Sequence, residues 1–100
     1  MKFGDFWKSM ISNLTNSQDL HTLVQRKPFE TVFRNGMILI TPSSFIERKI
    51  TQEQFLLVWQ MAKTLPAGQQ FVRQNYNQIT RNGSYMLALM RKYLDGESVQ

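Results

Sequence analysis

The apolar positions of the first quarter of the chain follow the spacing of amphipathic helices. Large apolar side chains recur every three or four residues, which places them on one face of an α-helix and leaves the charged residues on the other. They are Phe3, Phe6, Trp7, Met10, Ile11 and Leu14. Asn16, with Asp19 three residues later, is typical of a helix start and predicts a second, short helix through Val24. Lys27-Pro28 should end it, because a residue before proline avoids the α region.

A β-hairpin is the clearest local prediction in the sequence. Two runs rich in β-branched and aromatic residues, 29–34 and 37–41, flank Asn35-Gly36. Both central residues tolerate the positive φ that a type I′ turn requires. The turn predicts a register that pairs Phe33 with Ile38, Thr31 with Ile40 and Val32 with Leu39. Helices are expected to cover one face of the hairpin and to leave the other partly open.

A third strand is expected immediately after the hairpin. Pro42-Ser43-Ser44 has the composition of a turn, and the alternation over 45–50 predicts a strand whose inward residues are Ile46 and Ile50. Arg48 falls on the same face of this strand. Because a buried, unpaired arginine is costly, either the strand is short or Arg48 lies near its open end.

The remaining half of the chain predicts two helices and an irregular segment between them. Thr51 and Gln54 form a capping-box signature that opens a helix ending at about Leu65. Residues 69–80 are compatible with a short helix, a loop or both. A final helix should start at Asn82 or Ser84 and end at Asp95-Gly96.

The order of elements predicts an antiparallel α+β fold. Strands do not alternate with helices, so a parallel sheet is not expected. We predict a small three-stranded antiparallel sheet packed by an N-terminal helix and two C-terminal helices. One domain should span 1–100, with its core in 3–95 and a frayed tail over 96–100.

The composition indicates a single hydrophobic core and favours a cytoplasmic location. The chain has 100 residues, of which 42% are hydrophobic, enough for one domain and not for two. It contains no cysteine, which excludes disulfides and thiolate zinc sites. No stretch has the apolar length of a signal peptide or a membrane span, so we expect a cytoplasmic protein without a membrane partner.

The charge distribution suggests a negatively charged ligand. The net charge is +5, and the stretch 54–94 contains no Asp or Glu. Its basic residues are Lys63, Arg73, Arg81, Arg91 and Lys92. A region of one sign attracts polyanions such as nucleic acid, although it is equally compatible with a solvated face that keeps the protein soluble.

Catalytic and metal-binding patterns are not found in the sequence. His21 is the single histidine, and no nucleophile or helical-spacing carboxylate accompanies it. Ser43 and Ser44 lack the flanking glycines of a nucleophile elbow, and no glycine-rich phosphate loop occurs. Glu47 and Glu53 are expected in different elements and not as an acid–base pair. We expect no catalytic residue, no metal and no cofactor.

Two polar clusters are the candidates for a binding site. One is Arg48-Lys49 on the third strand; the other is Arg81-Asn82-Gly83-Ser84 before the last helix. Free N–H groups at a helix N-terminus beside an arginine favour an anion, although an ordinary capped helix has the same sequence. The predicted nucleic-acid or anion-binding residues are Arg48, Lys49, Arg73, Arg81, Asn82 and Ser84.

The same clusters carry a resemblance to small bacterial domains of unassigned function. The shared features are Thr41-Pro42-Ser43-Ser44, Arg48-Lys49-Ile50, Phe55 with Trp59, and Thr80-Arg81-Asn82-Gly83-Ser84-Tyr85. In these features the chain resembles accessory modules of restriction-type and HNH-type nucleases and stand-alone proteins of mobile elements and integron cassettes. The resemblance covers about residues 27–94 and implies a DNA-associated binding role. The chain departs from the pattern at Phe45-Ile46, where the resembling domains are small and polar.

Two functions from different classes follow from these patterns. The first is a non-catalytic binding module that associates with nucleic acid through a basic face. The alternative is a protein-interaction domain or homodimer that uses exposed aromatic residues of the helices. Its interface anchors would be Phe6, Trp7 and Trp59.

Overall fold

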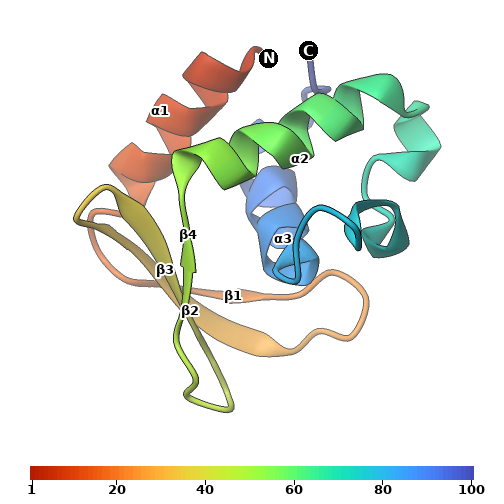
Figure 1. The fold of residues 1–100 in the computed structure, drawn as a ribbon. Helices are drawn as coiled ribbons and strands as arrows, with labels where there is room; N and C mark the ends of the chain where they lie inside the picture. The colour runs from red at the N-terminus through yellow and green to blue at the C-terminus, as the bar shows by residue number, and fades with distance from the viewer.

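A computed structural model describes all 100 residues, and its chain order is helix, four strands, then helices (Figure 1). The long helices are α1 (Phe3–Asn13), α2 (Gln52–Thr64) and α3 (Gly83–Leu94). The strands are β1 (Gln18–His21), β2 (Pro28–Arg34), β3 (Met37–Pro42) and β4 (Arg48–Ile50). Two short 3-10 helices follow α2: η1 (Ala67–Gln69), and η2 (Arg73–Tyr76), which lies within the segment 69–80 expected to be a short helix or a loop.

The strands form one antiparallel sheet in the order β1-β2-β3-β4. The α+β class is confirmed, but the sheet has four strands and not three. The extra strand is β1, where a short helix was expected. Leu20 pairs opposite Phe29 of β2 and is buried, whereas its neighbours Asp19 and His21 are exposed. Pairing along the edge of β2 outweighs the local helix-start signal at Asn16, because strand formation depends on such neighbours more than on intrinsic propensity.

The hairpin between β2 and β3 has the predicted turn and register. Asn35 and Gly36 both adopt positive φ, 53° and 76°. The pairs are Phe33 with Ile38, Val32 with Leu39 and Thr31 with Ile40, as predicted. Thr31, Ile38 and Ile40 are buried on the inner face, while Val32 and Leu39 lie half-buried on the opposite face.

The expected third strand is present only at its end. A turn closed by the Phe45 N–H, which donates to the Pro42 carbonyl oxygen at 2.9 Å, uses the first half of the segment. Only three residues, β4, then remain to pair with β3. Phe45 and Ile46 are 83% and 71% exposed, so the inward position predicted for Ile46 is wrong. Ile50 faces the core as predicted.

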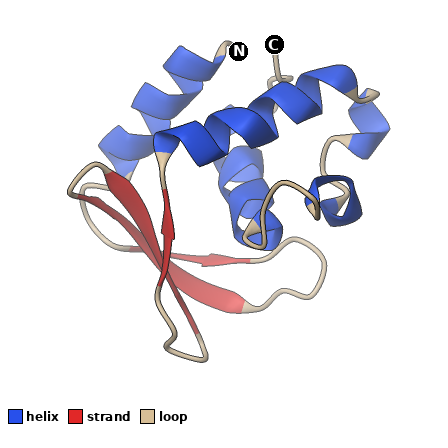
Figure 2. Cartoon of the chain, viewed as in Figure 1, coloured by secondary structure: helices blue, strands red, loops and turns tan.

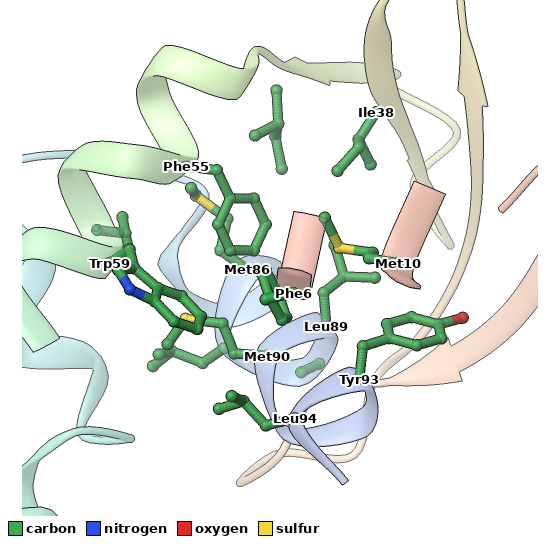
Figure 3. Close-up of a cluster of buried hydrophobic side chains, with 14 of the residues drawn as sticks. Phe6, Met10, Ile38, Phe55, Trp59, Met86, Leu89, Met90, Tyr93 and Leu94 are labelled. Carbon is green, nitrogen blue, oxygen red and sulfur yellow. The ribbon is translucent and has the colours of Figure 1, made fainter. Parts of the chain in front are cut away.

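The helices cover one face of the sheet and leave the other open (Figures 1 and 2). The core between these layers is rich in aromatic rings and methionines (Figure 3). Phe6 stacks at 4.8 Å from the Trp59 ring and 5.4 Å from Phe55. The predicted interface anchors Phe6, Trp7 and Trp59 are only 0%, 6% and 1% exposed, so they fill the core and cannot anchor a partner.

The ends of α2 and α3 lie where the sequence predicts them, with Asn82 at the N-cap and Asp95 at the C-cap of α3. Thr51 and Gln54 form the predicted capping box at the start of α2. Between α2 and α3 the buried Tyr76 donates its hydroxyl to the Gln70 carbonyl oxygen at 2.6 Å, and burial raises the pKa of Tyr76 to about 12. The phenol therefore stays protonated and holds the short helices together.

The two ends of the chain lie side by side (Figure 1). The Gln100 N–H donates to the Met1 carbonyl oxygen at 3.1 Å, and the Trp59 indole N–H donates to the Gln100 carbonyl oxygen at 2.8 Å. Val99 is buried against the core. The tail over 96–100 is therefore packed, not frayed as expected from its sequence.

None of the helices combines the length and the apolar character that a membrane crossing requires.

The burial of Phe6 leads to a prediction that separates core from interface. Phe6→Ala should lower the free energy of unfolding by about 3–5 kcal/mol, because it empties a fully buried site between two rings. Urea denaturation followed by tryptophan fluorescence measures the loss. The control is Lys8→Ala, an exposed change on the same helix, which should alter stability by no more than about 0.5 kcal/mol. A Phe6→Ala protein as stable as the wild type would contradict this assignment of the core.

Candidate anion-binding cleft

An open cleft of about 420 Å³ lies between the β1–β2 loop, η2 and the first turn of α3. Arg48, the first residue of β4, also lines it. Segments far apart in the sequence therefore meet at one end of the sheet. The volume falls within the roughly 300–1,000 Å³ of pockets that bind small organic groups.

Four basic side chains line the cleft, and no Asp or Glu does. They are Lys27, Arg48, Arg73 and Arg81. The only ion pair of the protein joins the N-terminal amine to Glu97 at 3.9 Å, so none of the four has a carboxylate partner. A recess bordered by charges of one sign concentrates its field on whatever enters. The cleft therefore has a positive potential that attracts anions.

Arg48 is the most enclosed of these cations. It faces the inner side of the sheet, opposite Ile40, at the start of β4 and thus at the strand's open end. Its Nη1 donates to the Asn82 Oδ1 at 3.2 Å, and its guanidinium lies 5.5 Å from the centre of the Tyr85 ring. The buried Nε–H has no acceptor in the protein. A partly buried charge with one neutral hydrogen bond and one ring contact is incompletely compensated.

The start of α3 presents free donors beside Arg48. Asn82 occupies the N-cap position, but its side chain does not cap the helix and instead accepts from Arg48. The amides of Gly83 and Ser84 donate to no acceptor within the protein. Ser84 and Tyr85 line the cleft, so this helix end borders it. The first amides of a helix carry a partial positive charge, which adds to that of the arginines.

Gly83 allows η2 to pack closely on this helix end. A Cβ at Gly83 would lie 3.3 Å from the Arg73 Cγ and 3.9 Å from the Tyr76 Cβ. The missing side chain leaves room for the stem of Arg73 against the backbone of α3. Close approach at this glycine thus brings Arg73 to the cleft.

The structure brings together most of the predicted binding residues. Arg48, Arg73, Arg81 and Ser84 line the cleft, and Asn82 holds Arg48. Lys49 does not join them, because consecutive residues of a strand point to opposite faces and Lys49 lies exposed on the open face of the sheet.

Lys27, Phe71 and Tyr85 are among the cleft residues that were not predicted as binding residues. Lys27 was assigned only to a helix end, since β1 and its loop were not recognised. Phe71 falls in the segment 69–80, for which a short helix or a loop was expected, and Tyr85 was named only in the sequence resemblance; both line the cleft. The sequence signals for this region were the acid-free stretch 54–94, which contains both aromatic residues and two of the arginines, and the two polar clusters at Arg48 and Arg81.

Other candidate groups lie apart from the cleft. His21 is exposed on β1, and Ser43 and Ser44 are exposed in the turn after β3. No three His, Asp or Glu side chains are close enough to hold a metal ion together.

Comparison with models of known protein families, with curated proteins and with solved structures found no match for this chain.

The incomplete compensation of Arg48 has a measurable consequence for stability. Arg48→Met keeps an extended side chain of similar length and removes the enclosed charge, so the free energy of unfolding should stay equal or rise by about 1 kcal/mol. Chemical denaturation at fixed pH measures it. Lys49→Met, on the exposed face of the same strand, is the matched control and should be neutral within about 0.5 kcal/mol. A loss of more than about 2 kcal/mol in Arg48→Met alone would mean that the arginine is a structural stabiliser of this corner.

Proposed function

We propose that this protein is a non-catalytic module that binds nucleic acid through phosphate groups held in the cleft. The observation that carries the proposal is the convergence of four unpaired cations, from four separate segments, on one recess without acids. The resemblance in sequence to nuclease-associated domains points to the same class of ligand.

The donors around the cleft favour phosphate over other anions. Arg48, Arg73 and Arg81 offer planar guanidinium groups, which bind phosphate oxygens in pairs. The free backbone amide and the hydroxyl of Ser84 add further donors. A phosphate group accepts several hydrogen bonds at once, so it suits a site with many donors and few acceptors.

The spread of charge favours a polymer over a free phosphate ion. The cations lie on the β1–β2 loop, β4, η2 and the segment before α3, on different sides of the recess. Several phosphates along one chain satisfy such an array, and the net charge of +5 adds long-range attraction. Contacts of this kind set the position of a nucleic acid without reading its sequence.

A second candidate is self-association, supported by a different observation. Val24, Phe45 and Ile46 are 88%, 83% and 71% exposed at the tips of two loops. Large apolar side chains that are exposed in this way are candidates for a contact surface. Light scattering across a range of protein concentrations tests it: a mass that rises to that of a dimer supports the candidate, and a constant monomer mass removes it.

The nucleic-acid proposal predicts how binding responds to salt. Each phosphate that the protein neutralises releases bound counterions. A plot of the logarithm of affinity against the logarithm of salt concentration therefore has a slope of roughly −0.7 to −0.9 per neutralised phosphate. Four cleft cations therefore give a slope near −3, and Arg81→Gln should make it shallower by about 0.8 while weakening binding to all sequences alike. Fluorescence anisotropy with labelled oligonucleotides at several salt concentrations measures both effects.

Arg34→Gln is the matched control for that measurement. Arg34 is exposed at the far end of β2, six residues and roughly 20 Å of strand from Pro28 beside the cleft. It should leave the slope and the affinity within about twofold of the wild type. The proposal fails if low salt gives no binding, or if both arginine variants weaken binding equally.

A further inference from the structure

We infer that the cleft takes an unpaired nucleotide, so that the ligand is single-stranded nucleic acid, with the base against the aromatic side chains and the phosphates on the arginines. This inference rests on the proposed function and names the form of nucleic acid that the same cleft selects. It is carried by two aromatic residues, Phe71 and Tyr85, that line the cleft among the cations.

Phe71 stands between the cleft and a second, smaller hollow. It lines both, whereas Arg91 lines only the second hollow. The Arg91 guanidinium lies over the Phe71 ring at 4.0 Å from its centre. Arg91 thus supports the ring from the side away from the cleft. A ring held in this way and still bordering a recess is suited to stack on a flat ligand.

Tyr85 is fixed by its neighbours in a similar manner. The Phe29 ring meets it edge-on at 5.1 Å between centroids and 75° between planes. Arg48 lies 5.5 Å from its centre. The ring is therefore held next to the most enclosed cation of the cleft, and a nucleotide entering there meets an aromatic surface and a guanidinium together.

The remaining polar side chains of the cleft suit the edge of a base. Gln25 and Gln74 line it from the β1–β2 loop and from η2. An amide side chain both donates and accepts, as base edges require, whereas phosphate recognition needs donors alone. Aromatic rings with amides nearby are the usual means of holding unstacked bases.

A duplex cannot use these features. Its bases are stacked inside the helix, so it presents only phosphates and groove edges to a recess of this size. The aromatic residues would then contribute nothing to affinity. A single strand offers a free base and its phosphates to the same cleft, and stacking on aromatic side chains tolerates any base.

The test compares four polyanions at one low salt concentration. The probes are single-stranded DNA and RNA of equal length, the matching DNA duplex, and inorganic polyphosphate. Phe71→Leu and Tyr85→Leu should each weaken single-strand binding by roughly tenfold and leave polyphosphate binding within about twofold. Arg81→Gln should weaken binding of all the probes. Phe45→Leu, an exposed aromatic outside the cleft, is the matched control and should change nothing.

A spectroscopic readout keeps the test independent of the variants' folding. A single strand carrying 2-aminopurine should lose emission on binding the wild-type protein, because the base stacks on an aromatic ring. The single-strand inference is overturned if the protein binds single strand, duplex and polyphosphate equally well, without quenching and without an effect of the leucine variants. The phosphate proposal would then remain intact. No binding of any probe overturns the proposed function.

Discussion

The hydrogen bond from Arg48 to Asn82 joins the two halves of the fold at the cleft, at 3.2 Å from Nη1 to Oδ1. It ties the edge strand β4 to the start of α3, across 34 residues of sequence. The bond also uses the side chain that would otherwise cap the helix, so the amide of Ser84 stays free. One contact therefore fixes a cation and preserves a donor beside it. The cost is a guanidinium that no carboxylate neutralises.

The rest of the structure provides a rigid support for this arrangement. The core of aromatic and methionine side chains packs the three long helices on one face of the sheet (Figure 3). Tyr76 and Gly83 then position η2 against α3, which sets the place of Arg73. Stability comes from the core, and the cleft lies at its border where charge is tolerated. Such separation is expected where binding residues oppose folding stability.

Much of the fold was predictable from the sequence, because its signals are local. The Asn35-Gly36 turn sets the register of β2 and β3 through backbone conformation, and Thr51 with Gln54 sets the start of α2. The strand β1 was not predictable, since Leu20 is fixed by pairing with β2 and not by its neighbours in sequence. Phe6, Trp7 and Trp59 were mistaken for interface residues because a helical stripe does not reveal how completely it is covered.

The candidate site was predictable as a set of cations and not as a shape. Arg48, Arg73 and Arg81 were chosen for their charge and their positions in the sequence, and the structure brings them to one cleft. Because side chains alternate along β4, Lys49 points away from the cleft, and the β1–β2 loop, which was not recognised in the sequence, supplies Lys27 instead.

The central claim is that this cleft binds phosphate. The most direct test is a two-dimensional 15N NMR titration with a short single-stranded oligonucleotide. The account predicts that the largest shifts fall on the amides of Arg48, Arg73, Gly83 and Ser84. Shifts confined to the loop of Phe45 and Ile46, or spread evenly over the surface, would contradict it.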